Sequence, residues 1–250
     1  MNICGPRPIV VVKTHAAGHC VQCDVRHRSV CNAMEDADLG RLAATAVQRH
    51  IEKGQIFIEE GQQAIDFFNI TGGTAKLFKM LPDGRQQITG FAGVGHFLGL
   101  AVSDTYAFSA EAIEDVDICR FSRPKLRSLL DDFPLMEKRL LETACNELVA
   151  AQEQMLLLGR KTARERVATF LAVRLHDGVS CGGSSERISL PMTRAEIADY
   201  LGLTIETVSR TLTRFKNEGR ITTPSREEVV ILDPRWLAGA AAGQDSYTLS

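Results

Sequence analysis

Three cysteines near the N-terminus have the spacing of a metal site. Cys20 and Cys23 are separated by two residues, so both thiolates can reach one metal centre, and Cys31 follows after seven further residues. One more cysteine and three histidines lie in the same polar stretch: Cys4, His15, His19 and His27. Free cysteines of folded proteins usually lie in the interior rather than in a polar arm, so we expect this group to bind a metal.

Two kinds of metal centre suit these thiols. Zinc would be held in a tetrahedron by Cys20, Cys23, Cys31 and a nearby histidine. An iron–sulfur cluster prefers four thiolates. Its fourth ligand would then be one of the remaining cysteines: Cys4, Cys119, Cys145 or Cys181. The residues alone leave the choice between these two centres open.

The composition is that of an ordinary globular protein. The chain has 250 residues, of which 44% are hydrophobic, enough to bury a core in one large or two modest domains. No apolar run is long enough to span a bilayer, and the early hydrophobic patch at 9–12 is too short for a signal peptide. We therefore expect a cytoplasmic protein with no membrane partner, in which the seven cysteines are not structural disulfides.

The charge is unevenly distributed along the chain. Residues 160–226 contain twelve Lys or Arg and seven Asp or Glu, a balance of +5, which leaves −7 for the rest because the whole chain is −2. This asymmetry favours a C-terminal part that meets phosphates.

The most specific pattern lies between residues 193 and 215. Thr193 and Glu196 have the spacing of a capping box that begins a helix, Gly202 turns the chain, and Thr204 caps a second helix. Two helices joined by a glycine turn are typical of a helix-turn-helix. The positions expected to be buried are Ile197, Ala198 and Leu201 on the first helix and Ile205, Val208, Leu212 and Phe215 on the second.

Opposite that buried line, the second helix carries a polar stripe at helical spacing, which consists of Glu206, Ser209, Arg210 and Thr213. Arg can bond O6 and N7 of guanine, Glu can accept from the amino group of cytosine, and Ser or Thr can contact thymine. We therefore predict that this stripe reads base pairs of double-stranded DNA. Two segments rich in β-branched residues, 221–223 and 229–232, flank a turn that contains Arg226 and predict a hairpin wing.

Short strands separated by glycine turns between residues 50 and 122 predict a double-sheet jelly roll. The expected strands are 55–60, 64–71, 74–80, 86–91, 106–113 and 116–121. A metal-dependent enzyme on such a barrel would need clustered histidines, and this segment has only His50 and His96. Because the chain has no other catalytic constellation, we expect it not to be an enzyme.

A single long helix is predicted from 132 to 158. One apolar line repeats at spacings of three and four, as in a coiled coil, and predicts a parallel homodimer seam: Leu141, Ala144, Leu148, Ala151, Met155 and Leu158. A second apolar line is expected to face a domain of the same chain: Leu135, Met136, Leu140, Val149 and Leu156.

The predicted fold class is therefore α+β, in five parts. They are a cysteine-rich arm at 1–38, a jelly-roll sensor domain at 39–122, a dimerisation helix at 123–159, a winged helix-turn-helix at 160–237 and a disordered tail at 238–250.

With these parts in this order, the chain resembles the cyclic-AMP receptor protein superfamily over about residues 18–236. The segment Leu203-Thr-Ile-Glu-Thr-Val-Ser-Arg210 is similar to the Glu-x-x-Ser-Arg reading helix of the FNR group of anaerobic regulators. The cysteine spacing, taken with Cys119, also looks like that group.

The resemblance implies an oxygen-labile 4Fe–4S cluster on Cys20, Cys23, Cys31 and Cys119. It also implies a homodimer that is active when the cluster is present, binds an inverted repeat of the TTGAT type and works with RNA polymerase. The expected function is an oxygen-responsive transcription regulator of anaerobic or microaerobic genes. The alternative is a small-molecule-, thiol- or zinc-responsive regulator of the same superfamily without an iron–sulfur cluster.

Three positions depart from the pattern of that superfamily. The seven-residue gap before Cys31 is longer than in the enterobacterial version, and Ala151 lies on the seam where that version has an acid. Leu100 stands where a ribose-binding Glu would be expected, and no Arg-Ser or Arg-Thr pair follows it before the barrel ends at Ser122. Cyclic nucleotides are therefore not expected to be ligands.

Overall fold

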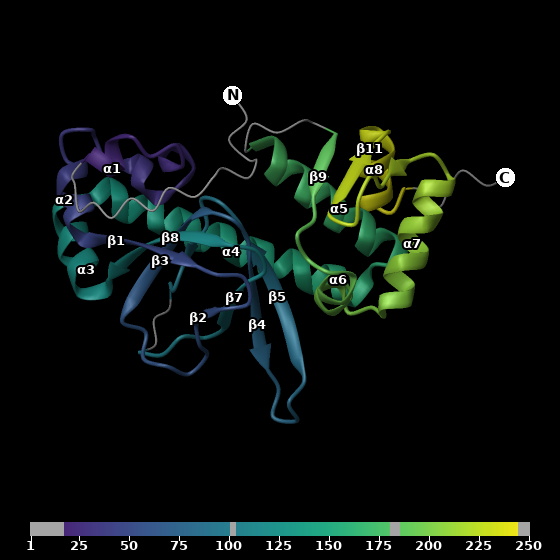
Figure 1. Cartoon of the computed structure of the whole chain (residues 1–250), viewed down its shortest axis with the longest axis horizontal. Coiled ribbons are helices and arrows are strands. Elements are labelled where there is room, and N and C mark those ends of the chain that lie inside the picture. The colour runs from purple at the N-terminus through teal and green to yellow at the C-terminus, as the bar shows by residue number, and fades with distance from the viewer. Residues whose placement is uncertain (1–17, 101–103, 181–185, 245–250) are drawn as a thin grey trace. The chain divides into compact units, whose positions relative to one another are not determined.

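The computed structural model describes residues 18–100, 104–180 and 186–244 (Figure 1). The described residues form two compact units, an N-terminal unit that ends at Ala150 and a C-terminal unit that begins at Ala151. No described helix combines the length and the apolar character needed to cross a membrane.

The N-terminal unit is built on two antiparallel four-stranded sheets. One has the order β1 (Ala46–Ile51), β8 (Val116–Ser122), β3 (Asp66–Gly72) and β6 (Phe97–Leu98), and the other β2 (Ile56–Ile58), β7 (Ser109–Ala112), β4 (Ala75–Met80) and β5 (Gln86–Ala92). The predicted double-sheet sandwich is confirmed. Strands β1 and β6 were not predicted, because β1 is largely exposed and does not alternate and β6 has only two residues.

The space between the sheets is filled by side chains from both of them. This core contains, among others, Ile58, Phe68, Ile70, Ala75, Leu98, Tyr106 and Ile118. The Tyr106 hydroxyl donates to the carbonyl oxygen of Asp66 at 3.0 Å, so the polar end of this buried ring is satisfied.

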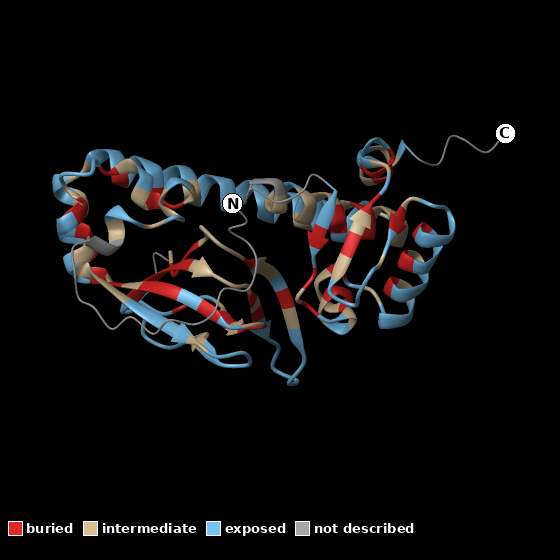
Figure 2. Ribbon diagram, turned by 45° about the horizontal axis from the view of Figure 1, so that its top comes forward, coloured by how far each residue is buried: buried red, intermediate tan, exposed pale blue. Residues whose placement is uncertain are grey.

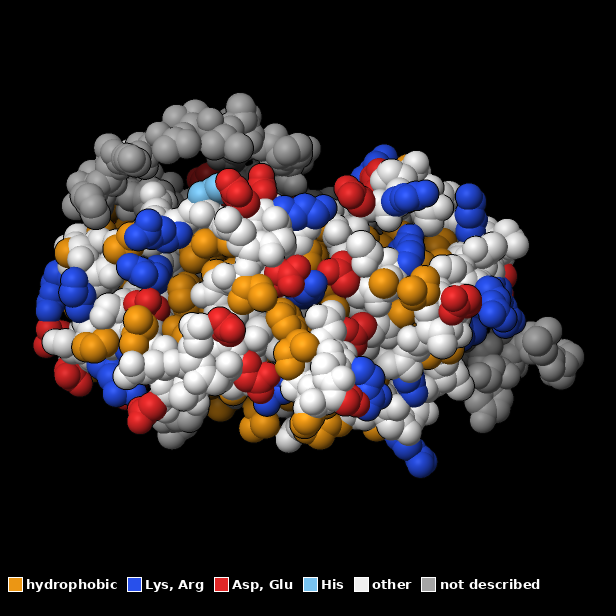
Figure 3. Space-filling view, turned by 60° about the horizontal axis from the view of Figure 1, so that its bottom comes forward, with side chains coloured by type: hydrophobic (Ala, Val, Ile, Leu, Met, Phe, Trp, Pro, Cys, Tyr) orange, Lys and Arg blue, Asp and Glu red, His pale blue; other side chains and the backbone are white. Residues whose placement is uncertain are grey.

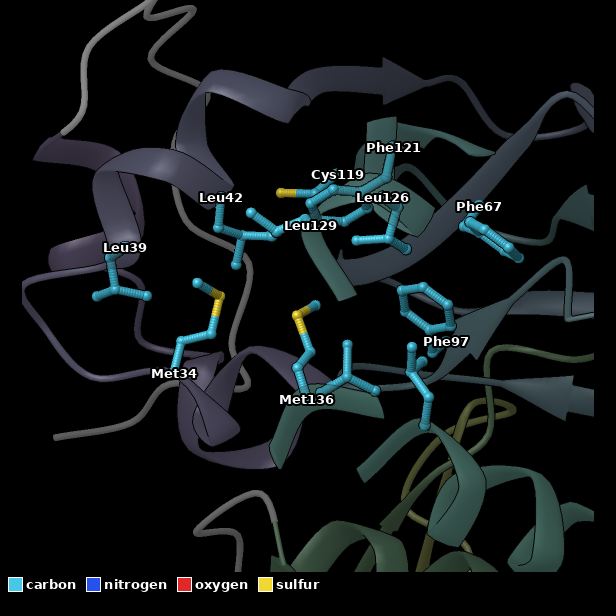
Figure 4. Close-up of a cluster of buried hydrophobic side chains, with 12 residues drawn as sticks. Met34, Leu39, Leu42, Phe67, Phe97, Cys119, Phe121, Leu126, Leu129 and Met136 are labelled. Carbon is cyan, nitrogen blue, oxygen red and sulfur yellow. The ribbon is translucent and has the colours of Figure 1, made fainter. Parts of the chain in front are cut away.

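A second core lies on the outer face of the β1-β8-β3-β6 sheet. The elements around it are α1 (Gly18–Val21), the 3₁₀ turns η1 (Arg26–Arg28) and η2 (Val30–Ala33), α2 (Leu39–Thr45) and α3 (Arg123–Asp132). Figure 4 shows Met34, Leu39 and Leu42 gathered with Cys119 and Phe121 of the sheet. The cysteine-rich arm is therefore packed onto the sensor sheet through apolar side chains.

The long helix α4 (Pro134–Arg160) begins two residues later than predicted, after α3 ends at Asp132. The segment 123–159 thus contains a short helix followed by the long one, as the Ser122 and Pro124 start signal before the Asp132 and Pro134 signal predicts. Met136 and Leu140 are buried as expected, but Leu135, Val149 and Leu156 are at least half exposed, so that part of the prediction is wrong. These three residues are separated by multiples of seven, and each directly follows a position equivalent to Leu141 in the seven-residue repeat. They therefore form a separate exposed line on the helix. Figure 2 shows that most of α4 is exposed.

The C-terminal unit is a winged helix-turn-helix, as predicted. Its elements are α5 (Ala163–Ser180), β9 (Arg187–Ser189), α6 (Arg194–Leu201), α7 (Ile205–Asn217), β10 (Ile221–Thr222), β11 (Glu228–Ile231) and α8 (Pro234–Ala241). The wing hairpin β10–β11 gains an unpredicted third strand, β9, on its other edge. Helix α8 continues to Ala241, beyond residue 238 where the tail was expected to start, because Trp236, Leu237 and Ala240 are buried. Residues 245–250 lie outside the described part.

Candidate nucleic-acid interface and thiol set

The two helices of the helix-turn-helix begin at the predicted caps. The Thr193 hydroxyl accepts from the N–H of Glu196 at 3.2 Å, and the Glu196 carboxylate accepts from the N–H of Thr193 at 2.8 Å. The Thr204 hydroxyl accepts from the N–H of Thr207 at 3.2 Å and so begins α7. These bonds satisfy N–H groups that have no partner inside their own helices.

Gly202 is required at the turn between α6 and α7. Its φ of 60° is a left-handed conformation that residues with a Cβ rarely adopt. A Cβ there would also lie 3.2 Å from Leu158 Cδ2 and 3.4 Å from Arg166 Nη1. The turn therefore packs closely against the end of α4 and the start of α5.

Helix α7 is anchored by one buried face. Val208, Leu212 and Phe215 are buried, as predicted, and the Phe215 ring meets Trp236 edge-on with centroids 4.9 Å apart. Ile205 was expected to be buried but is 48% exposed, because it is the first residue of the helix and lies outside the packed turns.

The predicted reading stripe lies on the exposed face of α7. Glu206, Ser209, Arg210 and Thr213 are all exposed, and the last three line a surface hollow of about 450 Å³. Hydrogen bonds from its own backbone N–H and from Thr204, with the charge of Arg210, lower the pKa of Glu206. The carboxylate therefore stays ionised and can only accept hydrogen bonds, as a partner of a cytosine amino group must.

Sequence reasoning missed the residues that hold the far end of α7. Arg164 of α5 donates two hydrogen bonds to the Glu218 carboxylate, at 3.1 and 2.8 Å, and its guanidinium lies over the rings of Phe215 and Trp236. Arg214 donates a third bond to Glu218 at 2.8 Å. The Arg214–Glu218 pair could have been found from its i,i+4 spacing, whereas Arg164 lies 54 residues away in sequence.

The structure brings four predicted ligands into one region. Cys20, Cys23 and Cys31 are half-buried in the arm, and Cys119 is buried on β8; we call these four the thiol set. Burial, and then the neighbouring thiols of the set, raise the pKa of Cys31 to about 11 and that of Cys119 to about 12. The four thiols are therefore within electrostatic range of one another.

The thiol set is not closed around one ion. Among the residues that the structure describes, no three His, Cys, Asp or Glu side chains are grouped tightly enough to bind a single metal ion. Of the other cysteines, Cys145 is exposed on α4, while Cys4 and Cys181 lie outside the described residues.

The predicted seam residues lie at the surface of α4. Leu141, Leu148 and Met155 are 60–70% exposed, and Ala144, Ala151 and Leu158 are exposed as well. Hydrophobic side chains also lie among charged ones elsewhere on the surface, as Figure 3 shows for one face, so exposure alone does not define an interface. The seven-residue repeat is what distinguishes the α4 line.

Known proteins resemble both parts of the chain. Residues 165–240 match the Crp-like helix-turn-helix domain family, and residues 48–133 match the cyclic nucleotide-binding domain family. The chain is 38% identical to the nitrogen fixation regulation protein FixK of Bradyrhizobium diazoefficiens, covering 93% of this chain and 98% of that protein. It is 36% identical to the transcriptional activator protein FnrL of Cereibacter sphaeroides, covering 91% and 93%.

A solved structure shows the same fold. FixK2 from Bradyrhizobium japonicum superposes with a TM-score of 0.73 at 32% identity, covering 78% of this chain and 96% of that one. The relatives are transcription regulators and not enzymes. This chain is a DNA-binding transcription activator of the FNR/FixK type and belongs to the CRP/FNR family.

Proposed function

We propose that this activator responds to oxygen through a 4Fe–4S cluster bound by the thiol set. The observation that carries the proposal is the position of Cys119, which lies on strand β8 yet is close enough to the three arm cysteines for their charges to add to the effect of burial in raising its pKa. Four thiols from two separate segments match the donor number that such a cluster takes, one thiolate for each iron.

The buried thiols suit a group that brings its own positive charge. With pKa values of about 11 and 12, Cys31 and Cys119 are neutral near pH 7 in the metal-free chain. Iron ligation requires thiolates, so binding of the cluster must release the thiol protons of Cys31 and Cys119. The positive charge of the bound iron would offset the cost of burying the two thiolates. When bound, the cluster supplies iron that oxygen can oxidise; the chain supplies the apolar enclosure of the second core.

Cluster loss would act on the start of the long helix. Cys119 packs in the same core as Leu126 of α3 and Met136 of α4 (Figure 4). Releasing the arm from Cys119 removes one wall of this core, so α3 and the first turn of α4 lose packing that fixes their position. Because regulators of this family typically act as homodimers, we propose that α4 pairs through Leu141, Leu148 and Met155.

On DNA, the dimer would present two copies of α7. The proposed target is an inverted repeat of the TTGAT type with about one helical turn between the centres of its half-sites. Arg210 would bond guanine and Glu206 the cytosine paired with it. RNA polymerase is the further partner that an activator requires.

Anaerobic purification tests the cluster. Iron and acid-labile sulfide should both be present at about four per chain, with broad visible absorption that bleaches in air. Cys119→Ala should abolish this loading, and Cys145→Ala, an exposed thiol on α4, is the matched control. A Cys119→Ala protein with the full cluster would remove Cys119 from the ligand set.

A second candidate is a regulator that responds to a small molecule, zinc or thiol oxidation without a cluster. The match of residues 48–133 to the cyclic nucleotide-binding domain family favours it. The filled space between the sheets and Leu100 at the ribose position argue against a cyclic nucleotide. Colourless anaerobic protein that contains zinc, or no metal, would support this candidate.

A further inference from the structure

The loop that carries Cys23 and Cys31 is closed by one side chain, Arg26. Its guanidinium donates to the carbonyl oxygen of Met34 and forms an ion pair with Asp36, both of which lie beyond Cys31 in sequence. The arginine backbone N–H donates to the Cys23 carbonyl at 3.1 Å. Arg26 is therefore tied to both ends of the segment between these two ligands.

We call the contacts of Arg26 with Met34 and Asp36 the clamp; the loop that it closes has further hydrogen bonds of its own. The Ser29 hydroxyl donates to the Arg26 carbonyl at 3.1 Å and accepts from the N–H of Cys31 at 3.3 Å. Ser29 is buried, and the following turn η2 starts on it. The seven residues between Cys23 and Cys31 thus form an ordered turn in which Arg26 has a fixed place.

One hydrogen-bond donor of Arg26 has no partner among the residues that the structure describes. Its Nε is inaccessible to solvent and makes no hydrogen bond, although the two terminal nitrogens of the same guanidinium are used. A buried donor without an acceptor costs about 1–3 kcal/mol, so such a group calls for an explanation.

Sulfur is the acceptor that the neighbouring residues offer. The Arg26 backbone bonds the Cys23 carbonyl, and Ser29 links the Arg26 carbonyl to the N–H of Cys31, so Arg26 is held between two cysteines of the thiol set. Thiolate and sulfide sulfurs accept hydrogen bonds and donate none, and a cluster with four thiolates carries net negative charge. A fixed cation with a spare N–H fits such a group better than it fits neutral thiols.

We propose that Arg26 compensates the charge of the bound cluster and donates its Nε–H to a cluster sulfur, and so sets how readily oxygen oxidises the cluster. This inference rests on the proposed function, because it requires the cluster on the thiol set. Positive charge and hydrogen bonds to sulfur favour the more negative, reduced state and raise the reduction potential. Removing them should make the cluster easier to oxidise.

The test compares three variants of the full-length, anaerobically loaded protein. Arg26→Gln removes the charge and the Nε donor, Arg26→Lys keeps the charge alone, and Asp36→Asn weakens the clamp but leaves the guanidinium. A unit charge about 6 Å away changes an equilibrium by up to roughly a hundredfold at an effective dielectric constant of about 20, and solvent around the partly exposed Arg26 side chain screens part of this effect. We expect Arg26→Gln to bind as much iron as the parent. Its equilibrium constant for reduction of the cluster should be roughly tenfold smaller, which lowers the reduction potential by about 59 mV for one electron.

Air decay of the visible absorption is the second readout. It should be several-fold faster for Arg26→Gln, closer to the parent for Arg26→Lys and unchanged for Asp36→Asn. Parent-like potential and decay in Arg26→Gln would overturn the proposal, as would an equal shift in Asp36→Asn, since loop order would then be the cause.

Two further outcomes are also decisive. If Arg26→Gln fails to load iron, Arg26→Lys is the deciding variant, because a charge-compensating role predicts that it loads iron and has a parent-like potential. If neither variant loads iron, the role of Arg26 is only to hold the loop. A parent protein that takes up no cluster would instead refute the proposed function.

Discussion

Arg166 joins the end of the long helix to the turn of the helix-turn-helix. Its Nη2 donates to the carbonyl oxygen of Leu158 at 2.8 Å, and its Nη1 donates to that of Leu201 at 2.9 Å. Its Nε donates to the Lys161 carbonyl at 2.9 Å. Carbonyl groups in the last turn of a helix have no partner inside the helix, so one guanidinium caps the ends of α4 and α6 together. A rotation of the last turn of α4 would therefore be carried to the start of α7.

Replacing Arg166 with Met should weaken DNA binding and leave the dimer intact. Three carbonyl groups lose a charged donor, and each such hydrogen bond contributes roughly 1.5–3 kcal/mol before relaxation. Fluorescence anisotropy with a TTGAT-type inverted repeat measures the affinity, and sedimentation measures the dimer. Arg160→Ala, an exposed arginine on the last turn of α4, is the control. Unaltered affinity in the Met variant would show that the junction does not position α7.

Arg210→Ala and Glu206→Ala should flatten base preference at the central G·C pair of each half-site. Loss of a base contact costs roughly 1–3 kcal/mol per half-site and relaxes discrimination at that pair. Arg226→Ala on the wing should instead weaken all sequences alike and reduce the salt dependence. Titrations against all four base pairs at this position distinguish the two effects. A Glu206→Ala protein that ranks the four pairs as the parent does would exclude Glu206 from base reading.

The sequence predicted α6 and α7 well because their signals are local. The capping box at Thr193, the glycine at 202 and the alternation of buried and exposed residues on α7 lie within a few turns of one another. The grouping of Cys119 with the arm depends on sheet register and followed only from the family resemblance. Arg164 and Arg166 were missed because Glu218 and Leu201, which they hold, are distant in sequence, and because their chemistry is that of ordinary surface arginines.

Leu148→Lys should shift the protein from dimer to monomer even when every chain carries the 4Fe–4S cluster. In a symmetric seam the substitution places two charges opposite each other in an apolar contact, which is far more costly than a surface change. Leu135→Lys is the matched control, because Leu135 is also highly exposed on α4 but lies off the seam. Sedimentation of both variants would give the answer, and a dimeric Leu148→Lys protein would remove this line from the interface.

Glu218 should make stability depend on pH in the acid range. Hydrogen bonds from Arg164 first, and then from Arg214, lower its pKa below the usual 4.5. A carboxyl whose folded pKa is depressed stabilises the fold above its unfolded pKa and loses that contribution as the pH falls through the folded value. Glu218→Gln should therefore cost roughly 1 kcal/mol at pH 7, and the difference from the parent should shrink as the pH falls below the unfolded pKa and vanish below the lowered folded pKa.

Chemical denaturation at a series of pH values measures this difference. Glu227→Gln, which removes the charge of an exposed carboxylate before β11, is the control. A Glu218→Gln protein with a pH-independent stability deficit would assign the effect to lost packing rather than to charge.

Asn69→Leu should stabilise the metal-free protein. Asn69 lies directly opposite Cys119 in the β3–β8 register and is only 2% exposed, and within the described part of the chain its Oδ1 has no hydrogen-bond partner. A buried acceptor without a donor costs about 1–3 kcal/mol, and Leu keeps the branching of the side chain while removing that cost. Asn69→Ala removes the same oxygen but leaves a cavity, so it should gain less or lose stability. Thermal unfolding of the three metal-free proteins provides the comparison, and a Leu variant that melts no higher than the parent would mean that the carboxamide already has a partner in solution.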